Sequence, residues 1–222
     1  RQEEEVAVAE EENRVEERPE DYLRVDLLEC EIGYQLVPLV DTNQGGDLIE
    51  RIVQIRKVAA MEMGFIVPPV RVRDNIQLKP NEYQIKIKGD PIARGELHPK
   101  SLLAIDSGVA EGPVEGVETT DPAFGLPARW IHSDQRERAE LLGYNVVETV
   151  AVLATHLTEV ITANAAELMG RQETQHLIDE FKQSHPAVVE ELIPDVVPVG
   201  RLQRVMQNLL MERVPVRDFR TI

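Results

Sequence analysis

The sequence is poor in cysteine, in aromatic residues and in positive charge, and each shortage excludes a class of protein. Cys30 is the only cysteine among 222 residues, so the chain cannot form an internal disulfide or a cysteine-based metal cluster. The chain carries 24 lysines and arginines against 40 acids, a net charge of −16, which argues against a general nucleic-acid binder. No apolar run approaches the roughly 18 residues that a membrane-spanning helix needs. The 42% hydrophobic and 29% charged fractions are typical of a globular protein.

The sequence motifs of common enzymes are also missing. There is no glycine-rich loop ending in Gly-Lys-Ser/Thr, no Gly-x-Gly-x-x-Gly after a strand, no His-Glu-x-x-His and no Gly-x-Ser-x-Gly. His156 with Glu159 and His176 with Asp179 have helical i+3 spacing, which we interpret as hydrogen bonds on a helix surface and not as a metal site. The sequence therefore supports a binding module better than a catalyst, and it indicates no catalytic residue and no metal site.

Both ends of the chain have distinctive patterns. Residues 1–24 hold ten acids and four arginines with few large apolar groups, which predicts a disordered or weakly helical tether. After Pro215 a helical pattern begins again, with Val216, Phe219 and Ile222 at three-residue spacing. Because this pattern stops at once and the first methionine is Met61, we interpret the chain as a piece of a longer protein.

Strand and helix patterns alternate from residue 25 onward. Apolar residues between Leu27 and Leu39 are spaced as in a strand, and Gly33 within them indicates a bulge or a close backbone approach. Strands are also expected over residues 70–72, 101–106, 130–131 and 144–147, and a hairpin over residues 83–92 with its turn at residues 89–90.

Two longer helices are expected in this part of the chain. Asp47 is a suitable cap for a helix that Gly64 ends, with its apolar positions at Leu48, Ile52, Ile55, Ala59 and Met63. Its outer face carries Arg51, Arg56 and Lys57, either an ordinary solvated face or a docking surface. A second helix is expected over residues 148–169, after a short one over 134–142. The periodicity places Val152 and Thr155 on the side of the second helix away from the core, so Thr155 is expected near the surface.

The C-terminal quarter differs from the rest of the chain. After Gly170 only helical patterns occur, and Pro186, Pro194 and Pro198 separate them. The sequence thus predicts a mixed α and β part up to about residue 168 and an all-helical part after it.

Residues 119–131 combine turn chemistry with two of the few aromatic residues. Asp121-Pro122 opens a turn, Phe124-Gly125 follows it, and Trp130 enters an apolar run. On spacing alone, two interpretations remain: aromatics that fill the core, which the usual burial of Phe and Trp favours, or a rigid ledge with an exposed apolar surface.

Several motifs in one order carry a family resemblance. They are Ile32 to Tyr34, Arg73 to Leu78 with Pro80 and Tyr83, Asp121-Pro122-Ala123-Phe124-Gly125-Leu126, Ala154-Thr155-His156-Leu157, and Gln207 to Leu210 with Val214 to Asp218. With them, the chain from about residue 25 to its end resembles the cytoplasmic domain of the FHIPEP family of flagellar type III export-gate proteins.

The resemblance implies an α+β fold of several subdomains. Residues 1–24 correspond to an acidic linker that follows a membrane domain at the cytoplasmic face of the bacterial inner membrane. Residues 25–99 with 149–168 correspond to a thioredoxin-like α/β first subdomain, and residues 100–148 to a small inserted α+β second subdomain. Residues 169–222 correspond to an all-helical third subdomain that is truncated, and a fourth is absent. In the family this region assembles into a nonameric ring.

The resemblance also implies a function and a site. The family region is a non-enzymatic docking platform that receives export chaperones with their cargo, export substrates and other parts of the export apparatus, including the ATPase complex, with no cofactor and no nucleic acid. Asp121, Phe124 and Thr155 match a chaperone-binding dimple, in which the carboxylate and the hydroxyl are expected to orient the partner beside the phenyl ring. The resemblance favours the exposed ledge for Phe124, with Trp130 beneath it.

Other family positions are matched less fully. Gly33, Arg56 and Lys57 match positions for ring or linker contacts. Tyr22 stands near the place where the family often has a tryptophan, which weakens the expectation that the linker docks on a neighbouring subunit. Two alternatives remain open: an export gate of a virulence injectisome, or an α/β enzyme with an unrecognised site.

Overall fold

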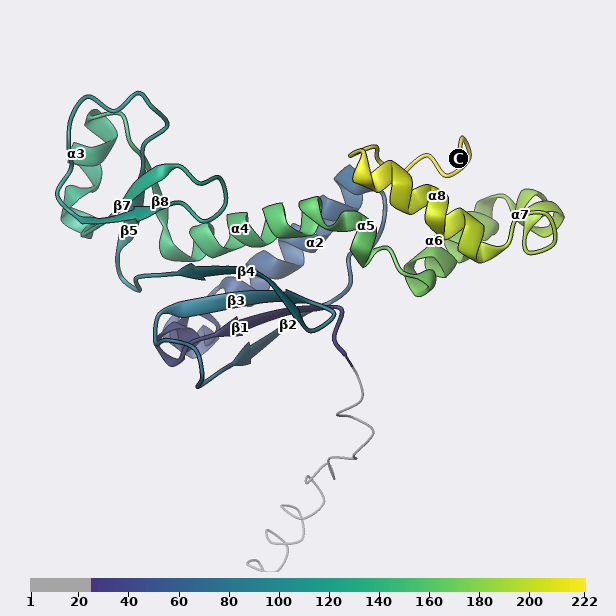
Figure 1. Cartoon of the computed structure of the whole chain (residues 1–222), viewed down its shortest axis with the longest axis horizontal. Helices are drawn as coiled ribbons and strands as arrows, with labels where there is room; N and C mark the ends of the chain where they lie inside the picture. Colours follow the sequence, from purple (N-terminus) through teal and green to yellow (C-terminus); the bar gives the residue numbers. More distant parts are fainter. Residues whose placement is uncertain (1–24) are drawn as a thin grey trace, which may run out of the picture.

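The computed structural model describes residues 25–222, and it has an elongated α+β architecture (Figure 1). Helix α4 (Thr149–Ala163) runs along the middle. One four-stranded sheet lies below it, a second sheet lies at one of its ends, and the last helices lie at the other end. The predicted change from mixed α and β to all-helical structure is confirmed. The acidic segment 1–24, with Tyr22, lies outside the described residues.

The first sheet combines β1 (Leu28–Ile32), β2 (Val70–Asp74), β3 (Glu82–Ile87) and β4 (Asp90–Glu96) in the order β2-β1-β3-β4. Strands β1 and β2 are parallel and are joined through helix α2 (Leu48–Met63), whereas β3 is antiparallel to β1 and β4. This is the strand order that a thioredoxin-like unit requires. The alternate residues Leu28, Cys30 and Ile32 are buried in the main core.

The first strand is shorter than its apolar pattern predicts. It ends at Ile32, and the residues from Tyr34 to Leu39 form the 3₁₀-helix η2, followed by η3 (Thr42–Gln44). The backbone N–H of Gly33 donates to Glu82 O at 2.8 Å, and that of Gln35 donates to Pro80 O at 3.0 Å. These bonds hold the chain over residues 80–82, so it leaves the direction of the sheet.

Helix α2 has the predicted bounds. Gly64 adopts the left-handed conformation with φ 86°, and its N–H donates to Ala60 O. Asp47 precedes the helix as predicted, but its carboxylate caps no backbone N–H and accepts instead from Arg51 Nε at 2.6 Å. The predicted β3–β4 hairpin is also present. Its turn is Lys88-Gly89, with φ 53° and 86°, and not residues 89–90, because Asp90 already pairs with Ile87.

The second sheet is antiparallel throughout. It orders β5 (Leu102–Ile105), β6 (Val117–Thr120), β7 (Pro127–Ile131) and β8 (Asn145–Glu148) as β6-β7-β5-β8. One face joins the main core, and the other packs on α3 (Arg136–Leu141), which follows η4 (Ser133–Gln135), through a small apolar cluster. Strand β6 was not predicted, because its sequence Val-Glu-Thr-Thr is mostly polar and lacks an apolar alternation. It forms an exposed edge strand through its pairing with β7.

The helix predicted over residues 148–169 is interrupted near its C-terminal end. Helix α4 ends at Ala163 and the short α5 (Ala165–Leu168) follows, while Asn164 Nδ2 donates back to Val160 O at 2.7 Å. The prediction that Val152 faces outward is wrong: its side chain is buried. Helix α2 and strand β5 both contact α4, so α4 is covered on more than one side.

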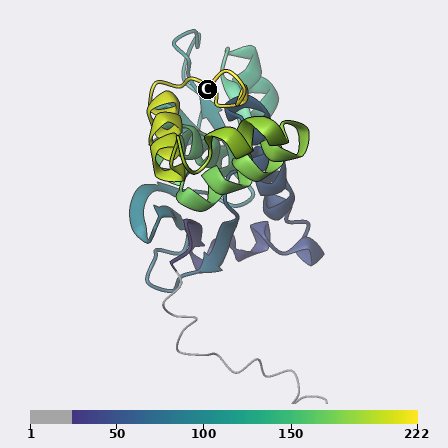
Figure 2. The same cartoon turned by 90° about the vertical axis from the view of Figure 1, so that its right-hand side faces the viewer.

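The C-terminal part consists of α6 (Arg171–Ser184), α7 (Pro186–Leu192) and α8 (Val199–Met211), which face the viewer in Figure 2. The helix predicted after Pro215 does not form. Val216 is buried, and its N–H donates to Met63 O at 2.8 Å, so a contact with the end of α2 replaces helical hydrogen bonding. Among the described residues, no helix combines the length and apolarity that crossing a membrane requires.

Candidate functional site

The 121–126 loop joins β6 to β7 as a closed, internally bonded turn. Asp121 Oδ2 accepts from the backbone N–H of Phe124 at 2.8 Å, and the Asp121 N–H donates to Leu126 O at 2.8 Å. Gly125 completes the turn with φ 70°, and its N–H donates to Asp121 O. Three hydrogen bonds within six residues hold the loop in one conformation.

The two aromatic residues of this stretch have opposite environments. The side chain of Phe124 is 58% exposed, whereas that of Trp130 is only 5% exposed. The Trp130 ring packs against His98, with ring centroids 5.2 Å apart. The exposed ledge is therefore the correct interpretation for Phe124 and the core position the correct one for Trp130.

Asp121 does not lie where the matched motif suggested. It is 3% exposed, so its carboxylate is not presented at the surface to orient a partner. The carboxylate instead receives the Phe124 N–H and fixes the loop that displays the ring. Asp121 thus acts on Phe124 through the conformation of the loop and not through a surface contact of its own.

Thr155 is exposed on α4, as its helical position predicts. The next residue, His156, is buried, and its Nδ1 lies 2.6 Å from the hydroxyl oxygen of Tyr83. The predicted surface hydrogen bond between His156 and Glu159 is therefore wrong. Burial lowers the pKa of His156, and the negative charge of Asp121 opposes this shift.

The second histidine pair also differs from the prediction. Asp179 accepts a hydrogen bond from Gln175 Nε2 at 2.8 Å, one turn earlier on α6, and His176 is exposed. Among residues 25–222, no group of histidines, cysteines and acids has the geometry of a metal site. Burial raises the pKa of the Cys30 thiol to about 12, and the nearby charge of Glu31 adds to this, so the thiol is unreactive at neutral pH.

The three other matched positions belong to the first sheet and α2. Gly33 is buried, and a Cβ added there would lie 2.1 Å from the backbone oxygen of Lys79. Arg56 is half-buried, and its Nε donates to Val67 O at 3.0 Å, which holds the chain that leaves α2. Lys57 is exposed. Of these three, Lys57 is the side chain that a partner could contact most directly.

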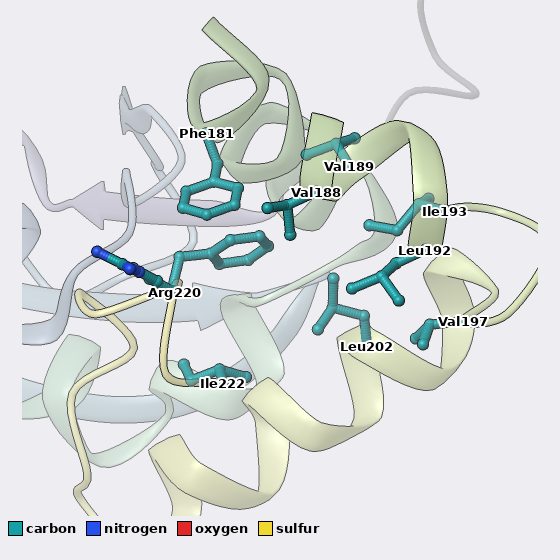
Figure 3. A pocket seen from close by; sticks show the side chains of 10 residues that line it. Phe181, Val188, Val189, Leu192, Ile193, Val197, Leu202, Arg220 and Ile222 are labelled. Atoms are coloured by element: carbon teal, nitrogen blue, oxygen red, sulfur yellow. The ribbon is translucent and has the colours of Figure 1, made fainter. Parts of the chain in front are cut away.

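An apolar cavity lies in the helical part (Figure 3). It has a volume of 130 Å³ and lies among α6, α7, α8 and the last residues of the chain. Phe181, Leu192 and Leu202 are among its walls, and Arg220 is its only charged neighbour. These walls offer no acid–base or metal-binding chemistry.

Acid is expected to destabilise the fold through His156. Burial lowers the pKa of His156 from its ordinary value of 6.5, and the charge of Asp121 only partly opposes this. The folded protein therefore binds this proton less readily than the unfolded chain. The stabilisation is fully present above about pH 6.5 and is lost as the pH falls through 6.5 toward the folded-state pKa. Denaturant unfolding between pH 7.5 and 5.5 measures this loss.

The matched variant for this measurement is His156→Asn, which cannot titrate. We expect its free energy of unfolding to change less over the same pH range. Tyr83 is the hydrogen-bond partner of the imidazole and Asp121 is the nearby charge, and both are unchanged in the variant. An equally steep profile in both proteins would show that other groups cause the acid sensitivity.

Sequence reasoning missed the pairing of His156 with Tyr83. Tyr83, Ile85 and Ile87 alternate with polar residues along β3, a signal from which the burial of Tyr83 could have been predicted, and a buried phenol needs a hydrogen-bond partner. Nothing in the sequence indicated which residue that partner is, because the two positions are 73 residues apart.

A family model and two curated proteins match this chain over 90% or more of its length. The model of the FHIPEP family matches residues 1–222. The flagellar biosynthesis protein FlhA of Bacillus subtilis is 50% identical over 200 residues, which are 90% of this chain and 30% of that protein. FlhA of Proteus mirabilis is 48% identical over 222 residues, which are 100% of this chain and 32% of that protein. The chain thus spans about a third of the length of these relatives.

Solved structures show a similar fold at lower identity. The Chlamydia pneumoniae CdsV protein superposes with a TM-score of 0.75 at 23% identity, covering 92% of this chain and 60% of that one. The cryo-EM structure of nonameric EPEC SctV-C superposes with a TM-score of 0.63 at 21% identity, covering 89% of this chain and 57% of that one.

Proposed function

Because the chain belongs to the FHIPEP family, we propose that it is a docking platform of a flagellar type III protein export gate, which receives export chaperones with their cargo and export substrates. The observation that carries this proposal is the exposed ring of Phe124 on a loop that Asp121 fixes. A rigid aromatic side chain buries a large apolar area on docking and loses little conformational freedom. Thr155, exposed on α4 next to the buried His156, supplies a hydroxyl that can orient the partner.

The platform acts by binding and not by catalysis. The shortest contact between an imidazole and a carboxylate among the described residues joins His132 Nδ1 to Asp134 Oδ1 at 2.9 Å on the exposed surface. His156 and Asp121 are both buried, and His156 is hydrogen-bonded to Tyr83. A substrate would not reach them from solvent. The proposal therefore includes no catalytic residue, no metal and no cofactor.

The division of the chain and its assembly are part of the same proposal. Residues 25–99 with 149–168 form the first subdomain, residues 100–148 the second and residues 169–222 part of a helical third, after an acidic linker over 1–24. The protein works at the cytoplasmic face of the inner membrane, in a nonameric ring that also meets the ATPase complex. The nonameric state named for SctV-C supports the ring. In this proposal Gly33 and Arg56 act on the ring contacts indirectly. Gly33 allows the close approach of the backbone at Lys79, and Arg56 holds the backbone at Val67. Lys57 contributes directly through its exposed side chain.

The flagellar assignment predicts a preference among chaperones. Calorimetric titration of the chain with a late-stage flagellar export chaperone and its cargo should give tighter binding than titration with a chaperone of a needle-type injectisome. The flagellar name of relatives that are 48–50% identical to this chain over the aligned residues supports this order. The reverse order would favour the second candidate function, an export gate of a virulence injectisome.

A further inference from the structure

Two buried polar side chains lie behind the proposed docking surface without belonging to it. Tyr83 on β3 is fully buried and His156 on α4 is 7% exposed. The Tyr83 hydroxyl oxygen lies 2.6 Å from His156 Nδ1, and the two rings meet edge to face with centroids 5.7 Å apart. This contact joins α4 to the first sheet by a buried hydrogen bond as well as by apolar packing.

The same contact is coupled by charge to the loop that carries Phe124. Burial raises the pKa of Tyr83, and the charge of Asp121 adds to this effect. The charge of Asp121 also opposes the lowering of the His156 pKa by burial. Both rings are therefore within electrostatic reach of the Asp121 carboxylate. That carboxylate accepts the Phe124 N–H at 2.8 Å. The buried Tyr83–His156 pair is thus coupled by charge to the buried carboxylate that fixes the 121–126 loop.

The first sheet is shaped to hold the Tyr83 hydroxyl at this point. Gly95 pairs with Tyr83 across β3 and β4, and a Cβ added to Gly95 would lie 2.5 Å from the hydroxyl oxygen. The absence of a side chain at Gly95 leaves the phenol room to reach His156. The hydroxyl is confined between a backbone and an imidazole, so its position is well defined.

We propose that Tyr83 and His156 are positioning residues of the docking surface. Their hydrogen bond sets the position of α4 on the first sheet, and this places Thr155, next to His156, relative to Phe124, which Asp121 holds. A surface that is ordered before the partner arrives binds more tightly, because docking then costs less conformational freedom. This inference rests on the proposed function and adds two buried residues to the site.

The direct test is Tyr83→Phe, which removes one oxygen and keeps the ring. We expect the affinity for a late-stage flagellar export chaperone with its cargo, measured by calorimetry, to fall by up to about 10-fold, because the free energy of one buried hydrogen bond is the most that its loss can transfer to docking. The matched control is Tyr144→Phe, which removes the hydrogen bond from Tyr144 to Gly112 O within the second-sheet region. The control should leave the affinity unchanged. Equal affinities for Tyr83→Phe and the unaltered chain would overturn the proposal.

A double-mutant cycle separates positioning from a loss of stability. If Tyr83 acts through the arrangement around Phe124, Tyr83→Phe should have little further effect on affinity in a Phe124→Ala background. Fully additive losses would overturn the positioning role. If Phe124→Ala alone leaves affinity unchanged, the proposed docking site itself fails, and the inference fails with it.

Variants of His156 give an independent comparison. His156→Asn places an amide near the position of Nδ1 and should retain most of the affinity, whereas His156→Leu should lower it as Tyr83→Phe does. Circular dichroism and thermal unfolding report whether each variant is folded. If both variants fold and bind equally well, the hydrogen bond does not position the surface.

Discussion

Replacing Phe124 with alanine is expected to weaken binding of a flagellar export chaperone with its cargo by about 30-fold or more. A central aromatic anchor commonly contributes about 2 kcal/mol or more to an interface. Because the ring is 58% exposed in the free chain, its removal should cost the fold little. Calorimetric titration measures the loss of affinity, and thermal unfolding should show a nearly unchanged midpoint.

The matched control for Phe124 is Leu141→Ala. Leu141 is an 88% exposed apolar residue at the end of α3, and no docking role is proposed for it. We expect its removal to leave the affinity unchanged. Asp121→Ala is a less selective test, because it removes the acceptor of the Phe124 N–H and releases the loop. If Phe124→Ala and Leu141→Ala bind equally well, the docking surface lies elsewhere.

Gly33→Ala adds one methyl group and is expected to destabilise the protein strongly. The added Cβ would lie 2.1 Å from Lys79 O and 2.6 Å from Pro80 O, and both atoms belong to the backbone, which cannot rotate away as a side chain can. Relief requires residues 79–80 to move, although Gly33 N and Gln35 N are hydrogen-bonded to this segment. We expect a loss of about 3 kcal/mol, which lowers the unfolding midpoint by about 6 to 12 °C in a chain of this size.

Gly45→Ala separates this backbone overlap from the general cost of replacing a glycine. Gly45 has φ 81° and nothing within 4 Å of an added Cβ, so only the strain of a left-handed residue applies, about 1–2 kcal/mol. A similar fall of the midpoint in both variants would contradict the close approach at Gly33. If the prediction holds, the proposed influence of Gly33 on ring contacts acts through the shape of residues 79–80 and not through a side chain.

Local periodicity was enough to predict much of the fold and part of the site. The apolar spacing from Leu48 and the glycine at position 64 determine α2, because a helix places every third or fourth residue on one face and ends readily at a left-handed glycine. The same reasoning correctly placed Thr155 at the surface. The family resemblance of the Asp121-to-Leu126 motif then indicated which exposed aromatic residue is of interest, where spacing alone had favoured a buried one.

The tertiary structure decided what depends on contacts between distant residues. It buried Val152 in the main core, on a side of α4 that periodicity left outside. It also buried the Asp121 side chain within its loop and paired His156 with Tyr83. Asp121 and His156, both expected at the surface, therefore lie inside the protein. A sequence pattern shows which face of an element is apolar, but it does not show which other elements cover that face. The sequence by itself therefore determined most of the elements and the motif, because these depend on local patterns. The division of the site into an exposed ring and a buried polar support arose only from packing.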